Sequence, residues 1–94
     1  MYATVRHYEN AKALSDAMDK APHEVKDALT AIPGFISYIA TRDGDSMTSI
    51  TICESKEACD ESTRVAREWV KDHVSTPLSP PVINDGDAFL NFSK

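Results

Sequence analysis

The chain has 94 residues, of which 41% are hydrophobic and 27% charged, and its formal net charge is −5. These values are typical of one folded domain. They exclude a disordered chain, and no apolar run approaches the ~20 residues of a membrane span. The excess of acidic over basic residues and the absence of a cluster of Lys and Arg argue against a nucleic-acid partner. We therefore expect residues 1–94 to form a single domain, bound neither to nucleic acid nor to a membrane.

The first segment, residues 2–8, is rich in β-branched and aromatic residues and is typical of a strand. Side chains alternate between the faces of a strand, so Arg6 shares a face with Thr4 and Tyr8, while His7 points to the other. The pattern does not decide which face meets the core. Because this strand is not preceded by a basic and then an apolar region, the sequence predicts no signal peptide and favours a cytoplasmic protein.

The next segment has the apolar spacing of a helix that packs one side against a core. We expect Asn10 to cap its N-terminus. Pro22 lacks a backbone N–H and would clash with the preceding turn, so two helical segments, 11–20 and 22–31, are expected with a kink between them. The apolar stripe consists of Ala11, Leu14, Met18, Ala21, Val25, Leu29 and Ile32.

A β-hairpin is predicted next, from strands at 35–42 and 47–53 around a loop at 43–46 that contains glycine. Simple alternation places Phe35 and Ile39 on one face of the first of these strands, with Ile36 and Tyr38 on the other. A strand that is apolar on both faces needs cover on both. Because the available helices can cover only one face, we expect the sheet of a second copy to cover the other.

A second helix is expected over 56–74, with Ser55 as its N-cap. Residues 75–81 are rich in proline and predict an extended connector. Strand character returns at 82–83, is interrupted by a turn or bulge at 84–87, and resumes in a last strand at 88–92. The inner stripe of this helix consists of Cys59, Ser62, Val65, Ala66, Trp69, Val70 and His73.

The predicted order is β-α-β-β-α-β, which is typical of the ferredoxin-like α+β fold. In this fold a four-stranded antiparallel sheet carries two helices on one face. No motif for a nucleophile, a phosphate loop or a metal site accompanies it. Cys53 and Cys59 have no zinc or redox spacing, and Asp85 and Asp87 form only a fragment of a calcium loop. We therefore expect neither a metal nor a cofactor.

Five segments of the chain carry a resemblance to a known family, and they are Val5–Tyr8, Ile32–Tyr38, Thr41–Gly44, Cys53–Ser55 and Trp69-Val70. Through them the whole chain resembles the dimeric α/β-barrel superfamily, and within it the antibiotic biosynthesis monooxygenase-like domains. The resemblance implies a homodimer whose sheets stack or join into a barrel, with an apolar pocket between each sheet and its helices. It also implies a range of activities that includes cofactor-independent oxygenases, haem-degrading oxygenases and small isomerases.

This chain departs from the haem-degrading pattern, which pairs a strand asparagine with a helix tryptophan and a histidine further along. The first strand of this chain has no asparagine, and Trp69 and His73 are only four residues apart. Haem degradation is therefore not the expected activity.

Five residues are candidates for chemistry. His73 and His7 are candidate general bases, because a histidine titrates near neutral pH. Arg6 is a candidate ligand for a carboxylate or enolate oxygen. Trp69 and Tyr38 are candidates for binding a flat substrate. The alternatives, which the residue types favour, are core packing for Trp69 and Tyr38, a structural role for His73 and an edge or interface salt bridge for Arg6.

Two functions remain open at this point. One is a cofactor-independent monooxygenase that acts on a small aromatic or enolisable substrate. The other is a non-catalytic homodimer that binds a small apolar ligand or a protein. The two are distinguished by whether a histidine reaches the cavity that we expect between the sheet and its helices.

Overall fold

The computed structural model describes all residues from Met1 to Lys94 and contains four strands and three helices. In chain order these are β1 Tyr2–Tyr8, α1 Lys12–Lys20, α2 Pro22–Thr30, β2 Phe35–Asp43, β3 Ser46–Cys53, α3 Lys56–His73 and β4 Val82–Asp87.

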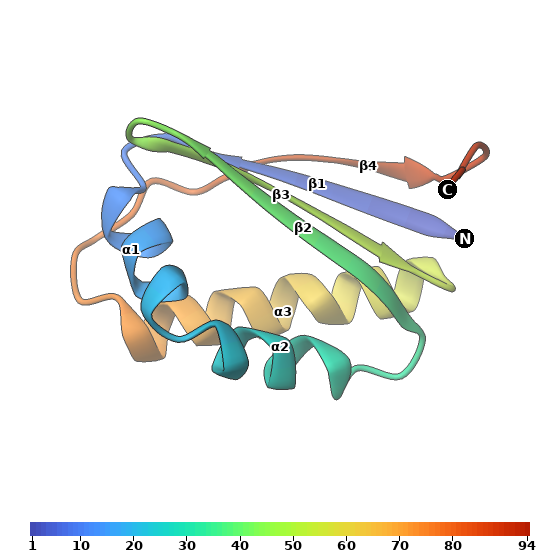
Figure 1. Cartoon of the computed structure of the whole chain (residues 1–94), viewed down its shortest axis with the longest axis horizontal. Coiled ribbons are helices and arrows are strands. Elements are labelled where there is room, and N and C mark those ends of the chain that lie inside the picture. Colours follow the sequence, from blue (N-terminus) through green and yellow to red (C-terminus); the bar gives the residue numbers. More distant parts are fainter.

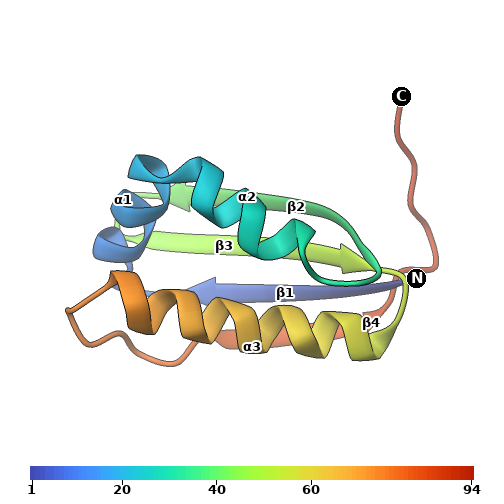
Figure 2. The ribbon, with the colours of Figure 1, turned by 90° about the horizontal axis from the view of Figure 1, so that it is seen from below.

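The strands form one antiparallel sheet in the order β2-β3-β1-β4. All three helices lie on the same face of this sheet, and the opposite face carries no element of the chain (Figure 1). Seen from the helix side, α1 and α2 lie over β2 and β3, whereas α3 runs along β1 (Figure 2). The ferredoxin-like fold is confirmed, and the sheet of the single chain is open rather than closed into a barrel.

The structure decides which face of β1 meets the core. Thr4, Arg6 and Tyr8 are buried beneath the helices, with relative exposures of 2%, 1% and 7%. His7 lies on the opposite face, where it is opposite Thr48 of β3 and Val82 of β4. The two candidate residues of this strand are therefore on opposite sides of the sheet.

A bulge in β2 overturns the simple alternation expected there. Phe35 is opposite Cys53, but Ser37 is already opposite Ile52, so one residue is inserted between the two pairs. The insertion brings Phe35 and Tyr38 to the same, helix-facing side, where both pack against the buried apolar cluster. Ile39 consequently points to the open face of the sheet and is 58% exposed.

The expected kink at Pro22 is a complete break, since α1 ends at Lys20 and Pro22 opens α2 at a position where its missing N–H costs nothing. Asn10 is not the N-cap of α1. The flanking residue is Ala11, with no side-chain cap, while Asn10 adopts a positive φ of 52° in the turn before it. Asparagine tolerates this left-handed conformation better than most residues, which explains its presence there. Ser55 caps α3 as expected by accepting from the N–H of Ala58.

The last strand also differs from expectation. The turn predicted at 84–87 is part of β4, and the strand predicted at 88–92 is absent. Asp87 is already opposite Tyr2, the first residue of β1, so the chain beyond it has no strand left to pair with. Residues 88–94 leave the sheet as an extended tail (Figure 2). The tail exposes Phe89, Leu90 and Phe92.

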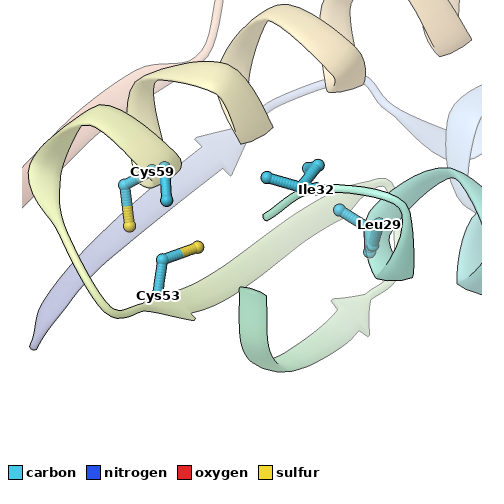
Figure 3. Close-up of a cluster of buried hydrophobic side chains, with 5 residues drawn as sticks. Leu29, Ile32, Cys53 and Cys59 are labelled. Carbon is cyan, nitrogen blue, oxygen red and sulfur yellow. The ribbon is translucent and has the colours of Figure 1, made fainter. Parts of the chain in front are cut away.

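The core divides into two apolar clusters. One lies at the N-terminal end of α3, where Cys53 and Cys59 come close to Leu29 and Ile32 (Figure 3). The other lies towards the opposite end of the sheet and contains Tyr8, Ala11, Leu14 and Met47, with Trp69 packed against it. Both cysteines are free and completely buried.

Burial predicts that the cysteines do not react in the folded protein. It raises the pKa of the Cys53 thiol to about 11, helped by the neighbouring Cys59. Only the thiolate reacts with a disulfide reagent, so at pH 8 we expect labelling to follow global unfolding rather than local exposure. Labelling with Ellman's reagent, with and without urea, measures this. Rapid modification of either thiol in the absence of urea would contradict it.

Candidate functional site

A narrow apolar cavity lies between the helices and the sheet. Its volume is about 40 Å³, and 12 of the 14 residues around it are hydrophobic. Trp69 of α3 and Tyr38 of β2 both line it, as does Arg6 of β1. The cavity expected from the sequence is thus present, and it brings together three of the five candidate residues.

Arg6 supplies the only charge in the wall of this cavity. Its guanidinium group donates to four hydroxyl groups: to Ser62 at 2.7 Å, Thr63 at 2.9 Å, Thr51 at 3.1 Å and Ser49 at 3.5 Å. All four acceptors are neutral, and Arg6 takes part in none of the salt bridges of the chain. A cation that is hydrogen-bonded but not neutralised leaves a positive potential inside the fold.

The indole of Trp69 adds an unused donor. Its Nε1–H is buried and has no hydrogen-bond partner. An unmade hydrogen bond at a buried donor costs about 1–3 kcal/mol, so such groups are rare and call for an explanation. Two of the residues that line the cavity therefore carry an unpaired N–H donor and a cation, and both groups are suited to an oxygen acceptor.

Tyr8 and Tyr38 contribute hydroxyl groups that stay protonated. Burial is the main cause that raises the pKa of both phenols. Arg6 acts in the opposite direction on both, and a hydrogen bond with Ser49 also lowers the pKa of Tyr38, but burial outweighs these effects. The two phenols are consequently donors to a ligand rather than bases.

His73 does not line the cavity. It lies at the C-terminal end of α3, where its ring stacks on Trp69 at a centroid distance of 4.0 Å and an angle of 8°. Its Nδ1 lies 2.9 Å from the carbonyl oxygen of Trp69, and its Nε2 lies 3.0 Å from Glu24 of α2. Both neighbours are acceptors, so both contacts are hydrogen bonds only when the imidazole carries two protons. In that state His73 links α3 to α2 and has no lone pair available for a substrate.

His7 is remote from the cavity as well, on the open face of the sheet. Its Nδ1 contacts the hydroxyl of Thr48 at 2.8 Å, and its Nε2 donates to Glu9 at 2.7 Å. The structure therefore brings neither candidate base to the cavity.

Two wider grooves flank the cavity, one on each side. The first has a volume of about 320 Å³ and shares Met18, Val25 and Met47 with the cavity. The second has about 340 Å³, runs beneath the connector between α3 and β4, and shares Arg6, Tyr8 and Val70. Each groove alone has the volume of a small-molecule site, which the cavity does not. Unbranched methionines adapt readily to a guest, so Met18 and Met47 can yield to a ligand from the first groove.

The hydroxyl residues around Arg6 were not anticipated from the sequence. The helical pattern puts Ser62 on the inner stripe of α3 but indicates no role for it, and no motif includes Thr63, Ser49 or Thr51. The sequence does contain a signal for them. The face of β3 that meets the helices carries the small polar residues Ser49 and Thr51, where apolar residues are usual. No group of three or more His, Cys, Asp or Glu is arranged to hold a metal ion. No helix is both long enough and apolar enough to cross a membrane.

Comparison with known proteins gives a likeness of structure but not of sequence. No family model and no curated protein matches the chain. A presumed antibiotic biosynthesis monooxygenase from Chloroflexus aurantiacus superposes with a TM-score of 0.69 at 13% identity, over 98% of this chain and 96% of that one. A dimeric ferredoxin-like protein from an uncultured marine organism gives 0.68 at 12% identity, over 100% of both chains.

A third match is SnoaB, a cofactor-independent oxygenase from Streptomyces nogalater. A variant of it superposes with a TM-score of 0.65 at 13% identity, over 99% of this chain and 97% of that one. Identities this low establish the fold alone. The chain therefore has the ferredoxin-like fold of the antibiotic biosynthesis monooxygenase-like proteins.

Proposed function

We propose that this protein binds a small, flat, oxygen-bearing ligand between its sheet and its helices. The observation that carries the proposal is the buried, unpartnered Nε1–H of Trp69, a residue that lines an apolar cavity together with the cation of Arg6. A ligand oxygen would satisfy the donor and place electron density near the cation, while the ring of the ligand meets apolar side chains.

The single tryptophan of the chain makes this proposal testable. We expect titration with 2-naphthol, which is neutral at pH 7, to shift the only indole N–H signal in a ¹⁵N correlation spectrum. In Trp69→Phe, which keeps a ring but loses the donor, the affinity should fall by about three- to tenfold, the value of one hydrogen bond. Equal affinity for both proteins, or shifts confined to the open face of the sheet, would contradict the proposal.

Cofactor-independent oxygenation is a second candidate function, supported by the charge of Arg6 and the likeness to SnoaB. A nearby cation favours the ionised form of a bound enol or phenol. Such an electron-rich anion can react with dioxygen directly. Conversion of a CH₂ group to C=O by O₂ releases one water, so the reaction needs no external reductant. Because no histidine lines the cavity, the substrate would have to ionise without one, and oxygen uptake with an anthrone tests this.

A homodimer is part of the same proposal. The open face of the sheet carries Val5, Ile50 and Ile52 around the exposed Ile39, and no helix covers them. The apolar side chains of the tail, Phe89, Leu90 and Phe92, are likewise exposed in the single chain. A second copy would cover both, as the dimeric ferredoxin-like relative suggests. A sheet-to-sheet interface of this kind would bury on the order of 2,000 Å² in total.

A further inference from the structure

We infer that the groove beneath the connector binds the carboxylate of an organic acid whose apolar body extends into the cavity beside Trp69. The apolar part of this inference rests on the proposed function, whereas the carboxylate part rests on the groove itself. The groove lies between α3, the inner face of β1 and β4, and residues 78–81.

The charge of the groove is the first argument. Its only ionic side chains are Arg6 and Arg67, and no Asp or Glu lines it. This is unusual in a chain with 15 acidic and 10 basic residues. Arg67 is exposed and, like Arg6, forms no salt bridge with a carboxylate of the chain. Two arginines that line one groove and have no carboxylate partner within the chain match an anion from outside.

The burial of Arg6 is the second argument. Arg6 is 1% exposed, and hydrogen bonds to neutral hydroxyls compensate only in part for the removal of its guanidinium group from water. Thr63 accepts from both Nε, at 3.3 Å, and Nη2, at 2.9 Å, and itself lines the groove. A carboxylate that enters the groove would approach the edge of the guanidinium formed by Nε and Nη2. Both of these nitrogens donate to the single hydroxyl of Thr63.

The shape of the groove is the third argument. Its volume of about 340 Å³ accommodates a small bicyclic acid. Leu78 and Ile83 form apolar walls, and Tyr8 and Val70 continue from the groove into the cavity. Arg67 and Arg6 both lie close enough to Tyr8 to act on its phenol. A carboxylate held between the two arginines can therefore direct its ring past Tyr8 towards Trp69.

The test compares three ligands with the same ring: 2-naphthoate, 2-naphthamide and 2-naphthol. We expect 2-naphthoate to shift the side-chain Nε–H signals of Arg67 and Arg6 as well as the Trp69 indole. It should bind about tenfold more tightly than 2-naphthamide, because charge-assisted hydrogen bonds are lost in the amide. Arg67→Gln should weaken 2-naphthoate about three- to tenfold. Arg64→Gln, which removes the same charge from the exposed face of the same helix, should not.

The outcomes separate this inference from the proposed function. If the acid and the amide bind equally and both shift Trp69, the cavity site stands and the carboxylate site is overturned. If Arg67→Gln and Arg64→Gln weaken the acid alike, only the net charge matters, and the site is again overturned. If 2-naphthoate shifts the arginine signals while neither it nor 2-naphthol shifts Trp69, the carboxylate site stands without the cavity. If none of the three binds at 5 mM, both are overturned.

Discussion

Arg6→Lys should lower the free energy of unfolding by about 2–4 kcal/mol, whereas Arg6→Met should change it by no more than about 1 kcal/mol. The expected order is unusual, because the substitution that keeps the charge is the more harmful one. Lysine has a compact, strongly hydrated ammonium group with three donors at one point. It would bear the cost of burial without reaching the hydroxyls of Ser49 and Thr51 on β3 as well as those of Ser62 and Thr63 on α3.

Methionine carries no charge, so its burial has no desolvation penalty for an ion, and its unbranched side chain fills much of the space of Arg6. Two of the hydroxyls it leaves behind already have other partners, since Ser62 donates to the carbonyl of Cys59 at 2.6 Å and Thr63 to the same oxygen at 3.4 Å. Arg6→Met should at the same time abolish the preference for 2-naphthoate over 2-naphthamide. Stability maintained without ligand selectivity would mark Arg6 as a residue that serves binding rather than folding.

Urea unfolding of the natural chain, Arg6→Lys and Arg6→Met, followed by the fluorescence of Trp69, measures how each substitution changes the free energy of unfolding. Arg67→Met is the control, because it makes the same exchange at an exposed position and should leave the free energy of unfolding within about 0.5 kcal/mol. If lysine proves harmless and methionine costs several kcal/mol, the charge of Arg6 itself holds the fold together, and its role as an anion ligand loses its physical basis.

Much of the fold could be predicted because local signals and global packing agree in this chain. The Gly44 hairpin, the Ser55 cap and the stripes of the helices each follow from rules that involve only neighbouring residues. Predictions failed where the deciding interaction was distant. The strand at 88–92 has a suitable composition, but β1 ends before it can be paired. The bulge at Ile36 likewise depends on how β2 meets β3, which its own sequence does not encode.

The candidate site was predictable in part for the same reason. Trp69 and Arg6 stand out along the chain as one large aromatic residue on an apolar stripe and one cation in an apolar strand. The spacing of four residues places Trp69 and His73 on one face of α3, and in the structure their rings stack. It could not reveal that Glu24, 49 positions away, binds the imidazole at the edge of the helix layer. The partners of a titratable group decide its role, and they come from other elements.

Ile39→Lys should convert a dimer into a monomer with little effect on the fold of the single chain. Ile39 is 58% exposed in the isolated chain, so a charge there should change the stability of the monomer by no more than about 0.5 kcal/mol. In a dimer that covers the open face of the sheet, the same charge would be buried without a partner and would face its own symmetry mate. We therefore expect the dissociation constant of the dimer to rise at least about a hundredfold.

Light scattering at micromolar concentration is the measurement. The natural chain should give about twice its mass of 10.3 kDa, and Ile39→Lys should give the single mass with an unchanged circular dichroism spectrum. Ala13→Lys is the matched control, because it adds the same charge at an exposed position of α1, on the far side of the sheet. A monomeric natural chain, or a dimer that survives Ile39→Lys, would exclude the open sheet face as the interface. A dimer that survives Ile39→Lys would point instead to the exposed tail at 88–92 as a surface that a second copy covers.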